Sequence, residues 1–507
     1  MSTTHDAAGP DDPATRHAVD RRSALRAFGV AGAAAAASPI LFSGAASAAA
    51  DATTSLLADG RAGGAPPVQG LHLTFGADPT RQMVVSWLTG GAVRRPRVVY
   101  GSAAGGFGSR ADATTRTYVD GASGRTVHVH HAVMGGLRAD TTYIYAVQHD
   151  GAHPDAGTFR TAPRGRTPFV FTSFGDQSVP TVTWSADGNG GFAPALNANA
   201  TPATADVVTG IERVNPLFHL LNGDLCYANL DPDRILTWNG FFANNTRSAR
   251  FRPWMPCAGN HEIESGNGPI GLSAYQTYFQ LPSTETDAEL RGLWYSFTVG
   301  SVHVVSLQDD DVALQNGGDI YTRGYSGGRQ RAWLRRDLAK ARESRDIDWI
   351  VVCMHQVMIS SSDANGSDLG IRQALGPLFD EFGVDLVVCG HEHDYERSLA
   401  LRGVERGSET LTPKPVSDDL ESIDTSAGTV HMFLVGGGVS GTTNEDFFAS
   451  GTAKVITGVG PADPTTGKHP SVYTMEKTPW LGFRDKSHPY GFAAFGVDPG
   501  NHAGGQT

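Results

Sequence analysis

The residues of this chain that could carry out chemistry are oxygen and imidazole donors that follow predicted strands. They stand in five short motifs: Gly175-Asp176 after FVFTSF, Gly223-Asp224 with Tyr227 three positions later, Gly259-Asn260-His261-Glu262, His355 after WIVVCM, and Gly390-His391-Glu392-His393 after VDLVVC. An apolar strand that ends in a polar turn is how an α/β enzyme presents ligands at one edge of its sheet. A single Gly-Asp after a strand usually just turns the chain. Five such endings in order predict one shared site.

The donor set is large enough to hold two metal ions. It consists of the carboxylates of Asp176 and Asp224, the amide of Asn260, the phenol of Tyr227 and the imidazoles of His355, His391 and His393. Two ions about 3.5–4 Å apart can clamp the attacking and leaving oxygens of a displacement at phosphorus, and we expect Asp224 to bridge them. Phenolate with carboxylate and imidazole favours Fe(III), whereas imidazole with an amide oxygen suits Zn, Mn or Fe(II). The sequence therefore predicts a binuclear centre of Fe(III) and one divalent ion.

Two regions of different patterning would position these motifs. Residues 67–163 contain short alternating strands at 71–75, 83–88, 97–101, 126–134 and 142–148, which indicate a small antiparallel sandwich. Residues 166–445 alternate buried strands with helical patterns such as 329–342 and 371–383, which indicate a separate α/β domain. The C-terminal segment 446–507 is rich in Gly, Pro and Thr, and we expect one last strand in it, near 490–497.

The N-terminus predicts export. Arg21-Arg22 precedes an Ala- and Gly-rich apolar run that ends in Ala46-Ser47-Ala48, so residues 1–48 look like a twin-arginine signal peptide and 49–66 like a linker. We expect the twin-arginine machinery as export partner, a secreted or periplasmic location, and no membrane anchor in the mature form. The net charge of −12 argues against general binding of nucleic acid or anionic lipid.

Other patterns have structural explanations. The four cysteines, Cys226, Cys257, Cys353 and Cys389, are expected to be small buried residues near strand ends, and the sequence cannot choose a disulfide pair among them. HVHH at 128–131 is expected on a sandwich strand. The three aspartates at 309–311 could sit near the site, although such a run usually forms a solvated loop. The glycine run 436–441 satisfies GxGxxG, but no helix pattern follows it, so we do not expect a dinucleotide site.

Taken together, FGD, GDLCYA, GNHE, MH and GHEHDYERS resemble the motifs of the purple acid phosphatases, a branch of the calcineurin-like metallophosphoesterase superfamily. The tyrosine of Gly-Asp-x-x-Tyr separates that family from its superfamily relatives, and Tyr395-Glu396-Arg397 is a further family mark. The resemblance covers about residues 68–440 and matches the two-domain plant and bacterial members. It implies an all-β fibronectin type III-like domain followed by an α/β catalytic domain, which is a four-layer sandwich of two mixed β-sheets flanked by helices.

The resemblance also implies a role for each donor. Asp176, Tyr227 and His393 would bind the ferric ion, Asn260, His355 and His391 the divalent ion, and Asp224 both. His261 would be a catalytic residue that binds the phosphate and stabilises charge on it, rather than a metal ligand.

One departure from the family concerns the proton donor. Plant members carry two histidines about ten residues after the ligand that matches His355, and one of them is proposed to protonate the leaving group. This chain has Ala364 and Asn365 there. Asp363, Asp368 and Glu262 remain as candidate acids, each of which would need a raised pKa. Good leaving groups would need no acid.

These expectations describe a secreted phosphatase that cleaves small phosphate monoesters by direct attack of metal-bound hydroxide. A phosphodiesterase or nucleotide pyrophosphatase of the same superfamily is the alternative within this chemistry. An alternative of another class is a cell-surface binding protein whose metal site is vestigial, against which the complete donor set argues.

Overall fold

The computed structural model describes residues 64–179, 182–186, 192–196, 201–315, 322–439, 448, 451–465 and 467–500. The predicted signal peptide and most of the predicted linker lie outside these residues. All described residues belong to one compact unit, Asp51–Thr507. Among the helices of this described part, none is long and apolar enough to cross a membrane.

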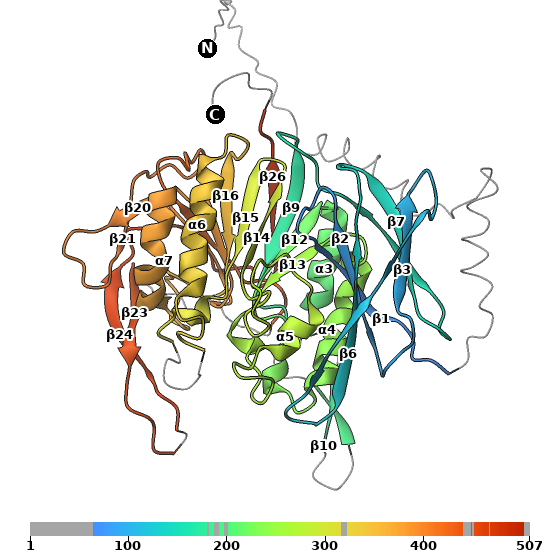
Figure 1. The fold of residues 1–507 in the computed structure, drawn as a ribbon. Helices are drawn as coiled ribbons and strands as arrows, with labels where there is room; N and C mark the ends of the chain where they lie inside the picture. The colour runs from blue at the N-terminus through green and yellow to red at the C-terminus, as the bar shows by residue number, and fades with distance from the viewer. Residues whose placement is uncertain are drawn as a thin grey trace, which may run out of the picture. The chain divides into compact units, whose positions relative to one another are not determined.

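The N-terminal region is a sandwich of two antiparallel sheets (Figure 1). One sheet has the order β1-β2-β6-β5, formed by β1 (Gln69–Phe75), β2 (Met83–Thr89), β6 (Thr126–Met134) and β5 (Thr114–Val119). The other has the order β4-β3-β7-β8, formed by β4 (Ser109–Asp112), β3 (Arg97–Ser102), β7 (Thr142–Gln148) and β8 (Asp155–Arg160). All five predicted strands are confirmed. Three were missed: β4, β5 and β8 are short or largely exposed, and their polar residues hide the alternation.

The α/β region contains two mixed sheets. The smaller has the order β13-β12-β9-β26, formed by β13 (Trp254–Cys257), β12 (Phe218–Asn222), β9 (Phe169–Phe174) and β26 (Ala493–Val497). The larger has the order β14-β15-β16-β18-β22-β19-β25, formed by β14 (Tyr295–Val299), β15 (Val302–Ser306), β16 (Trp349–Cys353), β18 (Leu386–Cys389), β22 (Val430–Leu434), β19 (Tyr395–Ser398) and β25 (Leu481–Asp485). The predicted fold class is therefore confirmed.

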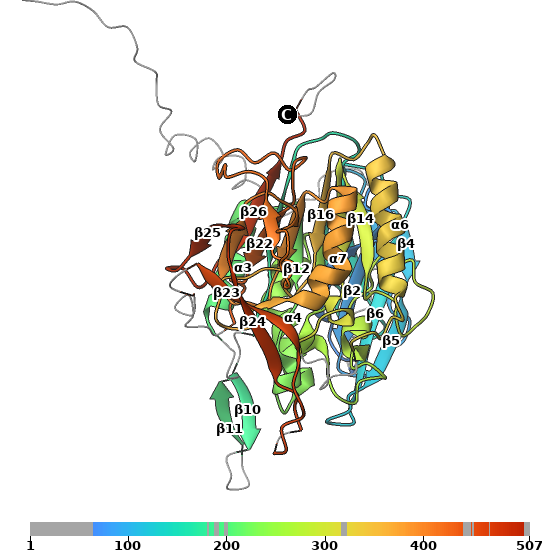
Figure 2. The same cartoon turned by 90° about the vertical axis from the view of Figure 1, so that its left-hand side faces the viewer.

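Helices cover the outer faces of the two sheets. In Figures 1 and 2, α6 (Arg329–Glu343) and α7 (Leu369–Phe382) lie over the larger sheet, and α3 (Ala203–Val214) and α4 (Arg234–Ala249) over the smaller one. The helix α5 (Ser273–Tyr278) is short, as are the 3-10 turns η1 (Ala228–Leu230), η2 (Asn260–Glu262) and η3 (Asp309–Asp311). The remaining strands form small ribbons: β10 (Val182–Ala186) with β11 (Phe192–Leu196), β20 (Leu401–Val404) with β21 (Pro413–Pro415), and β17 (Ser367–Asp368) with β23 (Thr452–Val459) and β24 (Ser471–Lys477).

The C-terminal segment contains more structure than the one strand predicted for it. Besides β26, it forms β23, β24 and β25. β26 pairs antiparallel with β9 in the smaller sheet, and β25 pairs antiparallel with β19 in the larger one. The prediction missed β23 to β25 because their residues are largely exposed or half-buried, so the apolar alternation is weak. The segment thus completes an edge of each catalytic sheet.

Strand direction explains where the motifs meet. β9, β12 and β13 run parallel in the smaller sheet, and β16 and β18 run parallel in the larger one. Each of these five strands is followed within four residues by one of the predicted donors. Parallel neighbours place their carboxyl ends at the same edge, so the five loops that follow them gather there.

Candidate metal centre

The first donor cluster contains Asp176, Tyr227 and His393. The Tyr227 hydroxyl donates to Asp176 Oδ1 over 3.0 Å and lies 3.1 Å from His393 Nε2. His393 Nε2 lies 3.4 Å from Asp176 Oδ1. These three side chains, from loops 51 and 166 residues apart in sequence, present an oxygen, a phenol and an imidazole nitrogen to one point.

The second cluster contains Asp224, Asn260, His355 and His391. His355 Nε2 lies 3.1 Å from Asp224 Oδ2, 3.1 Å from Asn260 Oδ1 and 3.2 Å from His391 Nδ1. Donor atoms of Asp224, His355 and His391 all lie within 4.8 Å of one another. Two imidazole nitrogens that face each other beside a carboxylate form a set of ligands that suits a divalent cation.

The carboxylate of Asp176 joins the two clusters. Its Oδ1 belongs to the first cluster, while its Oδ2 accepts a hydrogen bond of 2.8 Å from the backbone N–H of His391, a member of the second. All seven donors that the sequence singled out are therefore placed in two adjoining groups, and the residues present fit a binuclear centre.

Backbone strain is concentrated at these positions. Among the described residues, ten other than glycine have positive φ, and five of them are predicted donors: Asp176, Asp224, Tyr227, His391 and His393, with φ of 50 to 79°. Such conformations are uncommon and cost about 1–3 kcal/mol each unless the surroundings enforce them. The strain supports a functional role for this edge of the sheets.

Two glycines of the motifs allow the close approach of the donors. A Cβ at Gly390 would lie 2.4 Å from Asp176 Oδ2 and 2.8 Å from His355 Nδ1. A Cβ at Gly259 would lie 2.3 Å from Asp224 Oδ1. Any side chain at either position would overlap a predicted ligand, which explains why glycine precedes the donor.

Burial and mutual charge set the protonation of the clusters. Burial acts to raise the pKa of Asp224, but the histidines beside it, led by His355, outweigh burial and hold its pKa below the usual value. Burial acts to lower the pKa of His355, yet Asp224 raises it well above its ordinary value. Burial and then the charge of His355 lower the pKa of His391. Without a cation, one proton on His355 thus compensates the buried carboxylate.

Tyr227 is protonated in the absence of a cation. Burial, followed by the charges of Asp176 and Asp224, raises the pKa of this phenol well above its usual value. A ligand to Fe(III) must be a phenolate, so binding of that ion would have to release the proton.

His261 faces the clusters without joining them. Its Nε2 lies 3.9 Å from Asp224 Oδ2, its ring centroid lies 4.4 Å from that of Tyr227, and its Nδ1 lies 2.9 Å from Asn229 Oδ1. Its backbone N–H donates to Asp224 Oδ1 over 2.8 Å. Asn229, which the sequence did not single out, therefore orients a histidine at the mouth of the site.

Gln315 is a second residue that sequence reasoning missed. Its Oε1 lies 2.6 Å from His391 Nε2, so it fixes the ring with Nδ1 toward the second cluster. Asn222 acts in the same way on His355, because its carbonyl lies 2.8 Å from His355 Nδ1. Such partners orient metal-binding imidazoles and fix their tautomers. No local signal marks Gln315, which lies 76 residues from His391.

The three candidate acids have other partners. Glu262 accepts hydrogen bonds from the backbone N–H groups of Asp224, Leu225 and Gly259, and so ties two ligand loops together. Asp368 caps the N-terminus of α7 and also accepts from the backbone N–H groups of Leu314 and Gln315. The Asp363 side chain is 59% exposed, 3.6 Å from Lys454. None of the three carboxyls has a hydrogen bond to a side chain of either cluster among the described contacts.

Two further expectations can be compared with the structure. The three aspartates at 309–311 are buried in η3, so the solvated loop is wrong. A position near the site is supported, because burial raises the pKa of Asp309 and of Asp310 while the charge of His355 acts to lower it. Gln308 and Gln356 donate to Asp310 and Ser326 donates to Asp311, which makes the burial of these two tolerable, whereas the carboxyl oxygens of Asp309 have no hydrogen-bond partner among the described residues. The four cysteines are buried, as expected, and are free thiols rather than a disulfide pair; HVHH lies on β6, as expected.

The glycine run at 436–441 also belongs to the site rather than to a dinucleotide fold. The backbone N–H of Gly437 donates to the carbonyl of Gly175, and that of Val439 to the carbonyl of Asp176. Its described part therefore packs directly against the loop that carries Asp176.

Comparisons with known proteins agree with this arrangement. Residues 68–161 match the family described as purple acid phosphatase, N-terminal domain, and residues 198–395 match calcineurin-like phosphoesterase. The chain is 56% identical to the uncharacterized protein Rv2577 of Mycobacterium tuberculosis over 87% of this chain and 83% of that protein. It is 29% identical to purple acid phosphatase 18 of Arabidopsis thaliana over 65% of each chain.

A solved structure shows the same fold. Purple acid phosphatase PPD1 from yellow lupin (Lupinus luteus) seeds aligns with a TM-score of 0.60 and 21% identity, covering 85% of this chain and 70% of that one.

The fold and the site together define a metallophosphoesterase, an enzyme that hydrolyses phosphate esters with a dinuclear metal centre. Within that class, the chain belongs to the purple acid phosphatase family, because both of its family matches and its relatives agree.

Proposed function

We propose that this protein is a secreted acid phosphatase that hydrolyses small phosphate monoesters at a centre of Fe(III) and one divalent ion. The observation that carries the proposal is the meeting of seven donors in two adjoining clusters of unlike chemistry, one with a phenol and one with an amide and two imidazoles.

Each donor has a role that its position supports. Asp176, Tyr227 and His393 would hold the ferric ion, and Asn260, His355 and His391 the divalent ion. Asp224 would bridge the two, since its carboxylate contacts His355 of the second cluster and its charge acts to raise the pKa of Tyr227 and of His393 in the first. When bound, the metal pair supplies Lewis acidity for a water nucleophile and for the phosphoryl oxygens.

The residues of the chain do the remaining work. Because Nδ1–H of His261 points at Asn229 Oδ1, His261 can donate from Nε2 to a phosphoryl oxygen only as the imidazolium, the form that a bound phosphate and an acidic solution favour. Among the described contacts, none of the three candidate carboxyls has a hydrogen bond to a side chain of either cluster, and the positions of the family's histidine pair hold Ala364 and Asn365. We therefore expect the enzyme to favour esters with good leaving groups, such as aryl phosphates, over alkyl phosphates.

Export is supported by the sequence of the first 48 residues, with its paired arginines and small-residue cleavage pattern. A fusion of these residues to a reporter should be exported in a twin-arginine-dependent manner, and export that survives replacement of Arg21 and Arg22 by Lys would contradict the proposal.

The function is tested by Asp224→Asn with Asp385→Asn as its control. Both aspartates are buried and accept hydrogen bonds from the protein, but Asp385 precedes β18 at the end of the strand opposite to the ligand loop. We expect Asp224→Asn to lose activity and bound metal together while remaining folded, and Asp385→Asn to keep its metal. Rates on matched aryl monoesters and diesters measure specificity. Full activity of Asp224→Asn would refute the site, and faster diester hydrolysis would refute monoester specificity.

A further inference from the structure

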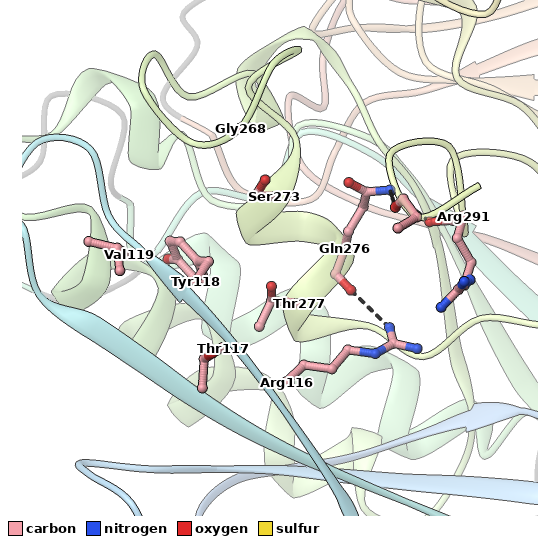
Figure 3. Close-up of a pocket in the computed structure, with 10 residues that line it drawn as sticks. Arg116, Thr117, Tyr118, Val119, Gly268, Ser273, Gln276, Thr277 and Arg291 are labelled. Atoms are coloured by element: carbon pink, nitrogen blue, oxygen red, sulfur yellow. Dashed lines mark hydrogen bonds between the residues drawn. The ribbon is translucent and has the colours of Figure 1, made fainter. Parts of the chain in front are cut away.

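A pocket of about 550 Å³ opens between the N-terminal sandwich and α5, and none of the predicted metal ligands lines it (Figure 3). Its walls come from β5, from α5 and from the loop around residue 290. The principal lining residues are Arg116, Tyr118, Val119, Ser273, Thr277 and Arg291. β5 is an edge strand that pairs only with β6, so its other edge is available to the pocket.

One end of the pocket carries two positive charges. Figure 3 shows the side chains of Arg116 and Arg291 converging from opposite walls. Burial and then the charge of Arg291 lower the pKa of Arg116, as expected for two neighbouring cations. The nearby carboxylates of Glu285 and Asp287 pair with Arg329 instead. Neither arginine has a carboxylate partner among the described ion pairs; Arg291 donates to the carbonyl of Thr286 over 3.0 Å, so both positive charges remain uncompensated by a carboxylate.

The cationic end is rigid. Arg116 Nη1 donates to the carbonyls of Gln276 and Phe279 over 3.0 and 3.4 Å, and its Nη2 donates to the Gln280 side chain. The Nε–H group of Arg116 and one N–H of its Nη2 have no acceptor among these hydrogen bonds. The Gln276 amide in turn donates to three carbonyls of 288–291 and holds that loop on α5. A ligand would therefore meet donors that are already ordered, which lowers the entropic cost of binding.

The other end has a different character. Figure 3 places Tyr118 and Val119 away from the arginines, with the hydroxyl side chains of Ser273 and Thr277 between. Val119 is 59% exposed, although it is a large apolar residue. The pocket thus offers charge at one end, hydrogen-bonding groups in the middle and one exposed apolar side chain, Val119, at the other end, where Tyr118 is buried against Tyr278.

We propose that this pocket binds a small organic phosphate, with its phosphoryl group between Arg116 and Arg291 and its organic part toward the exposed side chain of Val119. Guanidinium groups match the geometry of phosphate oxygens and form strong charge-assisted hydrogen bonds with them. The volume is that of an ordinary small-molecule site and exceeds what a bare anion fills. This second site is independent of the metal centre and would remain if the proposed function failed.

The test is isothermal titration calorimetry of the metal-loaded protein with phenylphosphonate, which cannot be hydrolysed, and separately with inorganic phosphate. We expect the wild type to bind two equivalents of phenylphosphonate, one at the metal centre and one in the pocket. Arg291→Gln should weaken the second site about tenfold or more, the usual effect of losing one charge-assisted hydrogen bond. Arg331→Gln, an exposed arginine on α6, is the matched control and should bind as the wild type does.

A second variant keeps the test independent of the arginines. Val119→Glu places a negative charge on an exposed side chain of β5 and should weaken the pocket without affecting the fold or the rate of ester hydrolysis. Phenylphosphonate binding in which no equivalent is weakened by Arg291→Gln or by Val119→Glu would overturn the proposal, whereas a single equivalent that both variants weaken would support the pocket and contradict binding at the metal centre. Binding of inorganic phosphate to the pocket as tightly as phenylphosphonate would overturn the assignment of an organic phosphate.

Discussion

Replacement of Gly390 by alanine should disable both donor clusters with one methyl group. The backbone of Gly390 is not left-handed, so alanine is conformationally allowed there and only the space around Cβ matters. That Cβ would lie 2.4 Å from Asp176 Oδ2, 2.6 Å from the Asn222 carbonyl and 2.8 Å from His355 Nδ1. Since ordinary contact begins at 3.4 Å, the Asp176 oxygen would have to move by about 1.0 Å (3.4 − 2.4).

A displacement of about 1 Å in a catalytic constellation can cost about 100-fold in rate. The loss should be larger here, because the same methyl group crowds the carbonyl that orients His355. We expect Gly390→Ala to lower kcat on an aryl phosphate at least 100-fold and to reduce bound metal in the purified protein.

The assay combines initial rates with elemental analysis of the same preparation, and far-ultraviolet circular dichroism confirms folding. Gly90→Ala is the matched control, because a Cβ at Gly90 meets nothing within 4 Å. It should keep both rate and metal. If Gly390→Ala kept the wild-type rate and metal content, the two clusters would not need their present spacing. That result would refute the assignment of the metal centre.

Three further outcomes are expected. Gln315→Ala should bind the divalent ion about 10–100-fold more weakly, as seen when the partner of a metal-binding imidazole is lost. Gln315→Glu still offers an oxygen to His391 and should restore the affinity, which metal titration measures. Equal affinity in the wild type and both variants would exclude the orienting role of Gln315. The iron-loaded protein should show a visible charge-transfer band that disappears in Tyr227→Phe, and a band that persists would remove the phenol from the ferric site. The third outcome concerns His72. Burial lowers the pKa of this histidine to about 4 from 6.5, although hydrogen bonds to the carbonyls of Gly70 and Tyr278 oppose the shift. The neutral ring therefore stabilises the fold above pH 6.5, and this contribution to the free energy of unfolding is lost as the pH falls toward 4. Between pH 6.5 and 5 this loss amounts to about 2 kcal/mol of unfolding free energy. Denaturant titration should detect it in the wild type and find it reduced in His72→Gln. The same dependence of stability on pH in that variant would contradict the lowered pKa of His72.

The donor motifs could be found from the sequence because their signals are local. A strand of apolar residues such as 169–174 or 218–222 is fully visible in a short window, and the glycine and acid that end it follow directly. The type of side chain then restricts the metal, since phenol, carboxylate and imidazole differ in the ions they prefer. For the same reason the main strands of the sandwich and the helices α6 and α7 were predicted close to their observed bounds.

Features that depend on distant contacts could not be found in this way. The burial of Asp310 depends on a glutamine 46 residues away, and nothing in the run of three aspartates indicates such a partner. Likewise, the half-buried strand β25 pairs with β19, far from it in the chain. Weakly patterned segments acquire their structure from the neighbours they pack against, which a local pattern does not contain.

The sequence by itself singled out the seven residues that we propose as metal ligands, because ligand chemistry is a property of side-chain type and the motifs are continuous in the chain. Only the tertiary structure decided how they are held: Glu262 is a brace between two loops, Gln315 orients His391, and Asn229 orients His261. The physical reason is that a ligand's identity is local, whereas its orientation is fixed by hydrogen bonds to residues that folding brings from elsewhere in the chain.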